Sequence, residues 1–222
     1  MTSPPDLKAR VLETIRREPS PTRAQASRQT KATIAAALIV DVALFVFCGG
    51  VHAGLRPTKL VLLTYGGGTA LALLAVWGAF GRGRSMLGRP KRWLVAITIA
   101  TPIALWSWMH VWSVIDPESA IASSGRVGLR CLALSLAFAA WPLGLLLRSL
   151  REKNPLTSVE TGAARGVAIG ALASVLVGLW CAQTSASHLV IGHALPLVLL
   201  SVLGGWLGGR MSGVAGGAAR AG

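Results

Sequence analysis

The chain has 222 residues and a formal net charge of +14, and 53% of its residues are hydrophobic, with a mean hydropathy of +0.59. A soluble core of this size does not need so many uninterrupted apolar runs, and the charged residues are confined to a few short segments. The composition therefore excludes an ordinary soluble domain and predicts an integral membrane protein. Residues 1–33 lack the apolar stretch of a signal peptide, so we expect no cleavage there.

Apolar runs of about 20 residues, the length that spans a bilayer, predict six transmembrane helices. They fall at roughly residues 34–54, 60–80, 93–114, 128–147, 166–183 and 189–208. The expected fold class is thus an all-α polytopic membrane protein, a bundle of six transmembrane helices. The expected organisation is a cytoplasmic N-terminal segment and linker, a transmembrane domain and a cytoplasmic tail, at residues 1–33, 34–210 and 211–222.

The basic residues predict the orientation of these helices. Most of the 22 Lys and Arg residues lie before the first predicted helix, after the sixth, or in the loops 81–92 and 148–165. On the opposite side of the predicted bundle there are only four, Arg56, Lys59, Arg126 and Arg130. By the positive-inside rule, both termini face the cytoplasm. Topology and contact with anionic lipid therefore account for the basic charge, and we expect no direct nucleic-acid binding.

The N-terminal segment contains a short amphipathic pattern between Asp6 and Glu18. Its apolar residues, at helical spacing, are Leu7, Val11, Leu12 and Ile15, and the basic residues mostly on the other side include Arg10 and Arg16. Prolines 19 and 21 end the pattern, and the run to Thr33 is predicted to be a flexible tether. So short a helix is marginal alone, and it either lies on the membrane surface or folds against a partner.

Three polar residues share one face of the first predicted span. Asp41, Cys48 and His52 are separated by seven and four residues, which places them on one side of a helix. An ionisable group inside a span is costly unless it faces the bundle interior, so these are intramembrane polar candidates. Asp41 is either functional or a buried carboxyl group that is protonated or paired with a hydroxyl.

Small residues recur at every fourth position from residue 162 through the fifth predicted span. They are Gly162, Gly166, Gly170, Ser174, Gly178 and Ala182. Such a stripe lets another helix backbone approach closely, which is the main way that helices associate in lipid. It predicts that the two helices between residues 162 and 210 form a packed hairpin.

The cysteines and histidines gather in the outer half of the predicted bilayer. Cys131 and Cys181 lie at matching depths, a few residues below the outer ends of two helices that we expect to pack side by side. Three interpretations stay open: a disulfide, capture of a soft metal ion by thiolates and imidazoles, or small apolar cysteines used in packing. No CxxC or HExxH spacing favours a preformed metal site.

The final hairpin carries a family resemblance. Its pattern is G-A-A-x-G-x-x-x-G-A-L at Gly162–Leu172, then Cys181, a polar turn, His193, and a closing L-G-G-x-L-G-G-R at Leu203–Arg210. With a basic tail and six helices, this resembles the NrsF-type family of bacterial membrane anti-sigma factors. A light-responsive, CarR-like member would have the same general design.

The resemblance implies that the N-terminal segment sequesters an ECF-type sigma factor at the inner membrane and releases it after a periplasmic or membrane stress signal, which regulates transcription negatively. In that family a pair of cysteines near the periplasmic side is implicated in signal reception, and Cys131 and Cys181 match it. We expect the apolar face of the N-terminal helix to dock on the sigma factor, with Arg10, Arg16 and Arg17 steering it to an acidic surface.

The rival interpretation is a small metal or solute transporter or efflux helper, with Asp41, Cys48 and His52 lining a path. The sequence has no clear inverted repeat to favour it. No nucleophile, base and oxyanion set can be assembled, so we expect neither an enzyme nor a cofactor. The sequence leaves open whether a heavy metal, an oxidant or light is the stimulus.

Overall fold

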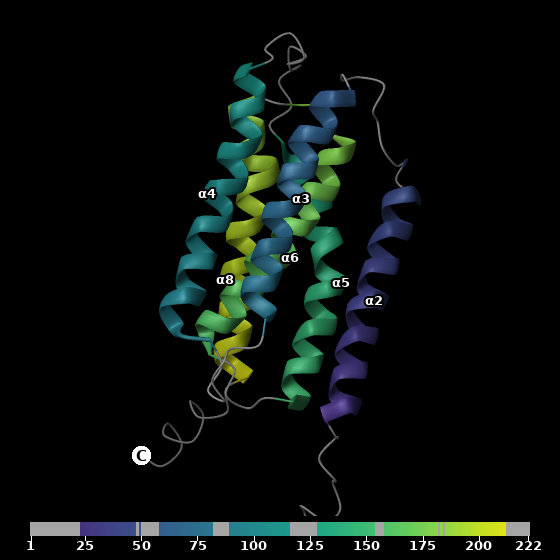
Figure 1. The fold of residues 1–222 in the computed structure, drawn as a ribbon, viewed down its shortest axis with the longest axis vertical. Coiled ribbons are helices and arrows are strands. Elements are labelled where there is room, and N and C mark those ends of the chain that lie inside the picture. Colours follow the sequence, from purple (N-terminus) through teal and green to yellow (C-terminus); the bar gives the residue numbers. More distant parts are fainter. Residues whose placement is uncertain are drawn as a thin grey trace, which may run out of the picture. The chain divides into compact units, whose positions relative to one another are not determined.

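The computed structural model describes residues 23–47, 49, 58–81, 89–115, 128–153, 158–181, 183 and 185–211. These residues form helices and no strand (Figure 1). The helices are α2 (Arg23–Phe47), α3 (Thr58–Phe80), α4 (Lys91–Ile115), α5 (Leu129–Lys153), α6 (Val159–Trp180), and a continuous run of α7 (Ala186–Leu189), a π-helical turn η3 (Val190–Ala194) and α8 (Leu195–Met211). The all-helical class predicted from the sequence is confirmed for this part of the chain.

The chain divides into two compact units, Met1–Ala36 and Ala37–Gly222. The described part of the first unit is the beginning of α2, which starts at Arg23. The prediction of a flexible tether up to Thr33 was therefore wrong for residues 23–33. These residues contain no proline or glycine, and Arg, Ala, Gln and Lys are good helix formers, so the helix extends well before the apolar stretch.

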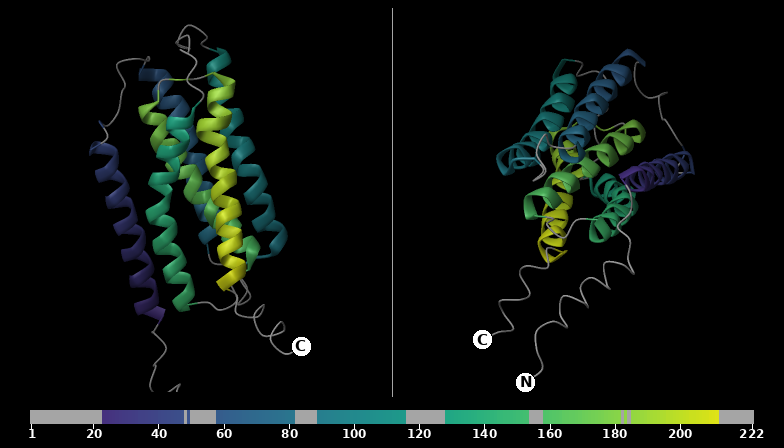
Figure 2. Two further views of the ribbon diagram at one scale, coloured as in Figure 1. Left: turned by 180° about the vertical axis from the view of Figure 1, so that it is seen from behind. Right: turned by 60° about the horizontal axis from the view of Figure 1, so that its bottom comes forward.

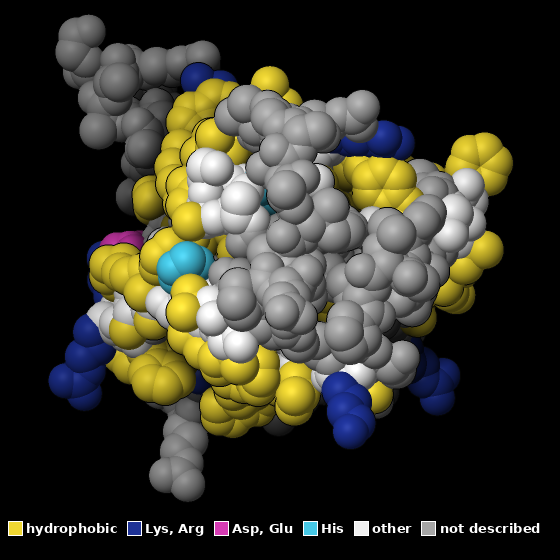
Figure 3. All heavy atoms as spheres, turned by 90° about the horizontal axis from the view of Figure 1, so that it is seen from above, with side chains coloured by type: hydrophobic (Ala, Val, Ile, Leu, Met, Phe, Trp, Pro, Cys, Tyr) yellow, Lys and Arg dark blue, Asp and Glu magenta, His cyan; other side chains and the backbone are white. Residues whose placement is uncertain are grey.

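Four helices are long and apolar enough to cross a membrane. Their spans are Val61–Phe80, Lys91–Trp112, Val159–Trp180 and Ala186–Arg210, and two shorter apolar stretches cover Ala35–Phe47 and Leu129–Leu145. Large apolar side chains face outward from these helices; Val202 of α8, for example, is 66% exposed. Figure 3 shows hydrophobic side chains over much of the described part of one face. An outer surface this apolar suits a lipid environment, in line with helices of membrane-spanning length.

Helix α6 is the most enclosed element of the second unit. It contacts α3, α4, α5 and α8, among which it lies in the ribbon drawings (Figures 1 and 2). Buried residues run along most of its length. Its contact with α5 includes Ile169 and Val177 of α6 and Phe138 of α5, which belong to one apolar cluster. The side-by-side packing expected for the predicted helices at 128–147 and 166–183 is confirmed.

The small residues of α6 are divided between two neighbours. A Cβ atom added at Gly162 would overlap the carbonyl oxygen of Gly204, and one added at Gly166 would overlap that of Leu200. The first half of the stripe thus permits direct contact between the α6 and α8 backbones, as the hairpin prediction required. Further along, Gly178 faces the ring of Tyr65 in α3, where a Cβ would lie 2.5 Å from Cε1.

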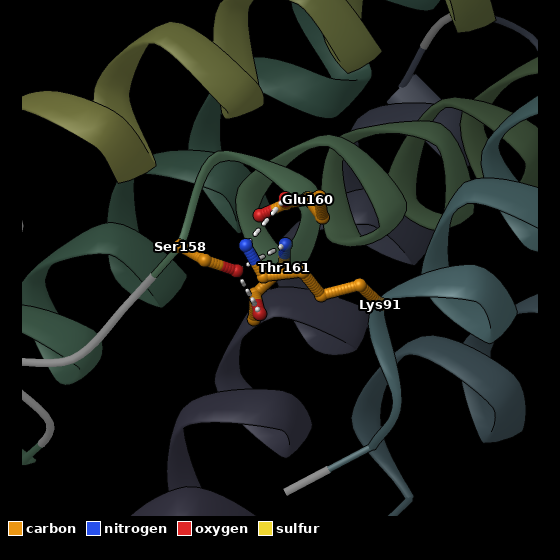
Figure 4. A network of polar contacts seen from close by, with 4 residues as sticks. All are labelled: Lys91, Ser158, Glu160 and Thr161. Carbon is orange, nitrogen blue, oxygen red and sulfur yellow. Dashed lines mark hydrogen bonds and ion pairs between the residues drawn. The ribbon is translucent and has the colours of Figure 1, made fainter.

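Polar contacts fix the beginning of α6 (Figure 4). The Ser158 hydroxyl oxygen accepts a hydrogen bond from the backbone N–H of Thr161 at 3.3 Å, which satisfies one of the free amides of the first turn. Glu160 pairs with Lys91, at the start of α4, over 3.2 Å. Because Lys91 is largely exposed, this ion pair contributes little, and the N-cap is the stronger restraint.

Replacing Ser158 with alanine is expected to destabilise the protein by ~1 kcal/mol, since the first turn of α6 loses its N-cap. The measurement is the thermal midpoint of the full chain in detergent, followed by circular dichroism. Ser158→Asp is the matched control, because aspartate caps equally well and complements the helix dipole. Equal midpoints for the alanine and aspartate variants would contradict a capping role.

Candidate functional site

Four side chains that can bind a metal converge in the second unit. They are Cys131 in α5, Cys181 after the end of α6, His188 in α7 and His193 in η3. One ligand atom from each lies within 4.8 Å of each of the others, and all four residues are buried. We call this group the thiol–imidazole cluster. The sequence places its members up to 62 residues apart, from 131 to 193, so only the helix packing unites them.

Two glycines bring the beginning of α5 against η3. Gly128 has φ +67°, a conformation that favours glycine, and its carbonyl oxygen accepts a hydrogen bond from Leu132 N at 2.9 Å. A Cβ at Gly128 would lie 2.9 Å from the backbone nitrogen of Gly192, and one at Gly192 would lie 3.0 Å from Cβ of Cys131. The absence of both side chains therefore allows Cys131 to reach the cluster.

Cys181 lies outside the helix that the sequence assigned to it. The predicted helix extended to residue 183, whereas α6 ends at Trp180 and Cys181 is its C-cap, with extended φ −89° and ψ 123°. Its backbone N–H donates to the carbonyl oxygens of Val177 and Gly178, at 2.9 and 3.1 Å. The helix ends early because the chain must reverse before Ser185, the N-cap residue of α7. Cys181 is thus held at the turn between two helices.

The π-helical turn explains how two histidines reach one site. His188 and His193 are five residues apart, which in an α-helix separates their directions by about 140°. The wider turn of a π-helix nearly stacks residues at this spacing, and the ring centroids are 5.7 Å apart. His188 Nε2 lies 3.1 Å from Sγ of Cys181. Single π turns are rare and occur often at functional sites.

The two thiols are free and lie in the same apolar cluster as Val177 and Ile169. The structure thus brings Cys131 and Cys181 together without a disulfide. His193 entered the sequence analysis through the family resemblance, and His188 only as one of several outer histidines. Sequence reasoning missed their convergence because it placed His188 in the polar turn before the sixth predicted span, which begins at residue 189. The glycine at 192, between the two histidines, is the available signal of an irregular backbone.

Asp41, the other candidate residue that the structure describes, does not join this cluster. Asp41 is buried in α2, and its Oδ1 atom has no hydrogen-bond partner among the described residues. Cys48 and His52 lie outside the described residues, so the structure does not show whether the three share a face. The sigma-binding candidates also lie outside them: Leu7, Arg10, Val11, Leu12, Ile15 and Arg16.

The chain is similar to a known protein family over most of its length. The family NrsF, described as negative regulator of sigma F, matches residues 15–212. The chain belongs to the NrsF family. The match includes every described helix and the whole thiol–imidazole cluster, and it begins at Ile15, so residues 1–14 lie outside it. No curated protein and no solved structure matches the chain.

Membership of NrsF confirms the resemblance seen in the final hairpin. It makes the chain a negative regulator of a sigma factor, and a sigma factor is therefore its partner. The family is regulatory rather than enzymatic, in agreement with the expectation from the sequence. Four of its described helices are long and apolar enough to cross a membrane.

Proposed function

We propose that this NrsF-family protein is an anti-sigma factor of the bacterial inner membrane. Residues 1–33 sequester an ECF-type sigma factor in the cytoplasm, residues 34–210 cross the membrane six times, and residues 211–222 form a cytoplasmic tail. A periplasmic or membrane stress signal causes release of the sigma factor. The observation that carries the proposal is the family match, which joins the end of the N-terminal segment and all the described helices in one regulator.

The ends of the helices support a membrane-spanning arrangement. Arg210 lies 4.0 Å from the ring centroid of Trp206, and Arg130 lies 4.4 Å from that of Trp180. Arg89 lies over Trp77 and donates to the carbonyl oxygen of Gly81. Arginine and tryptophan together suit the boundary between lipid and water, where one part of each side chain is apolar and another polar. The two shorter apolar stretches, in α2 and α5, supply the remaining spans of the proposed six.

The thiol–imidazole cluster is the proposed receiver of the signal. With both termini in the cytoplasm, the beginning of α5 and the end of α6 lie on the periplasmic side. A change at Cys131 and Cys181, by oxidation or metal capture, alters the packing of α5, α6 and α7. Such a local change shifts a bundle with two arrangements toward the one that releases the sigma factor.

The N-terminal segment is the proposed output. Leu7, Val11, Leu12 and Ile15 form the apolar face of a short helix that docks in a groove on the sigma factor, while Arg10 and Arg16 attract it to an acidic surface. The amphipathic pattern supports this docking. A marginal helix of this length gains stability from a partner rather than from its own hydrogen bonds.

Replacing both Leu12 and Ile15 with aspartate in the full-length protein is expected to abolish co-purification of the sigma factor, because two carboxylates would be buried in an apolar groove. The measurement is affinity purification in detergent, followed by identification of the bound protein. A second preparation without residues 1–30 is expected to give the same loss.

The matched control is Ser20→Asp with Thr22→Asp, which adds the same charge to the N-terminal segment outside the amphipathic pattern. It should retain the sigma factor. Undiminished retention by the Leu12 and Ile15 variant would refute docking through this face. Substrate flux in proteoliposomes, without any bound sigma factor, would instead favour the transporter.

A further inference from the structure

The thiol–imidazole cluster has the donor set of a closed tetrahedral metal site. Zn²⁺ in structural sites binds four ligands, and two thiolates with two imidazoles are one of its common combinations. With Zn–S near 2.3 Å and Zn–N near 2.0–2.1 Å, tetrahedral ligand atoms are about 3.3 to 3.8 Å apart. The Cys181–His188 pair is at 3.1 Å, and no pair exceeds 4.8 Å. Small side-chain rotations therefore suffice to enclose an ion.

The hydrogen bonds of His193 prepare it as a ligand. Its Nδ1 atom lies 3.3 Å from both the carbonyl oxygen and the hydroxyl oxygen of Ser174. The hydroxyl proton of Ser174 is itself donated to the carbonyl oxygen of His193, at 3.0 Å. Because a carbonyl oxygen can only accept, Nδ1 carries the ring proton and Nε2 keeps its lone pair. Metal-binding histidines are typically oriented by such a bond from the second ring nitrogen.

Charge and burial select the kind of ion. On binding, Cys131 and Cys181 each lose one proton, so the cluster supplies two negative charges and one ion displaces two protons. A divalent ion makes the complex neutral, whereas a monovalent ion leaves a net negative charge in a buried apolar site, which is costly. Sulfur and nitrogen donors prefer Zn²⁺ and softer ions over Mg²⁺ or Ca²⁺.

We propose that Cys131, Cys181, His188 and His193 form a binding site for one zinc-like divalent ion, Zn²⁺ or Cd²⁺. The ion joins the beginning of α5, the end of α6 and the α7–η3 turn. It would add to the polar contacts between Ser174 and His193 and to the apolar cluster that Cys131 and Cys181 share. All four coordination positions are filled by protein, so the site serves binding rather than catalysis. The idea that this ion triggers release of the sigma factor rests on the proposed function. The binding of the ion does not depend on that function.

Binding is tested with the purified full-length protein in detergent, under a thiol-free reductant and without any sigma factor. Co²⁺ is the spectroscopic probe, since tetrahedral coordination by thiolates gives intense visible bands and a thiolate-to-metal absorption in the near ultraviolet. We expect one Co²⁺ per chain and full displacement by one equivalent of Zn²⁺ or Cd²⁺. Binding well below one ion per chain would overturn the site.

Substitutions then assign the ligands. His188→Ala and His193→Ala are each expected to weaken Zn²⁺ binding at least tenfold, as changes around metal sites do. Cys131→Ser or Cys181→Ser alone should lower the thiolate absorption, and the double variant should remove it. His110→Ala is the matched control, because His110 stacks on Trp106 and does not belong to the cluster. Unchanged affinity in either cluster histidine variant would overturn the four-ligand proposal.

A measurement on the unsubstituted protein keeps the test valid if a variant does not fold. Zn²⁺ is expected to slow alkylation of Cys131 and Cys181 while leaving Cys48 unaffected, as read by mass spectrometry of the labelled peptides. Equal labelling of Cys131 and Cys181 with and without Zn²⁺ would contradict the site. If the unsubstituted protein retains the sigma factor but binds no metal ion, only the metal site is refuted. If it binds the metal ion but retains no sigma factor, only the proposed function is refuted.

Discussion

Replacing Gly166 with leucine is expected to prevent α6 and α8 from packing and to leave little folded protein in detergent. The Cβ of any side chain at this position would overlap the carbonyl oxygen of Leu200 and lie 3.2 Å from Cα of Ser201. These are backbone atoms, which cannot rotate away as a side chain does. Overpacking costs typically 1–3 kcal/mol and more where relief is blocked, and here the two most closely packed helices must separate along their length.

The matched control is Gly144→Leu in α5, where an added Cβ meets nothing within 4 Å and the new side chain faces outward. This variant should keep the thermal midpoint of the original protein or exceed it, because leucine favours a helix over glycine. The measurements are monodispersity by size-exclusion chromatography and the thermal midpoint by circular dichroism. Similar behaviour of the two variants would show that the α6–α8 contact does not hold the fold together.

The helices of the second unit and their closest contact were predictable from the sequence. Apolar runs of membrane-spanning length locate helices without knowledge of their neighbours, because every backbone polar group in lipid must be satisfied within the helix. The stripe beginning at Gly162 and Gly166 likewise predicted a close neighbour, since small residues at every fourth position have few other uses. The structure identifies that neighbour as α8.

The ends of helices were less predictable, for a physical reason. Hydropathy marks where a helix is apolar, whereas the backbone ends a helix according to capping and the geometry of the next turn. Helix α2 therefore begins at Arg23, far before its apolar stretch, and α6 stops at Trp180, ahead of the polar turn. The early end of α6 changes the candidate site, because Cys181 becomes the C-cap residue of α6 instead of lying on the surface of that helix.

The candidate site was half predictable. Matched depth in two neighbouring helices was sufficient to pair Cys131 with Cys181, as depth is set by counting residues along each span. The contribution of His188 depends on the π turn, which reverses the conclusion that α-helical spacing gives for residues five apart. The glycine at 192 indicates an irregular backbone but not a π turn, and its close approach to Gly128 follows from the packing of α5 against η3.

Replacing both Cys131 and Cys181 with serine is expected to leave the sigma factor sequestered and to abolish its release under stress. Serine has nearly the same size but forms neither a disulfide nor a stable bond to a zinc-like ion, so the bundle keeps its resting arrangement and loses its receiver. The measurement is a reporter transcribed from a sigma-dependent promoter, with cadmium, peroxide and light applied separately. Low activity before stimulation and no rise after it is the expected result.

Two further variants make this result specific. Cys48→Ser, the third cysteine, should respond normally, which excludes a general effect of losing a thiol. His188→Ala with His193→Ala separates the two chemistries: oxidation to a disulfide requires only the thiols, whereas metal capture requires the imidazoles as well. If this histidine double variant still responds to peroxide but not to cadmium, the cluster receives two signals: oxidation of its thiols and binding of a metal ion by its thiols and imidazoles. Normal induction in the double cysteine variant would remove the cluster from signal reception altogether, while leaving the sequestering segment as the regulator's output.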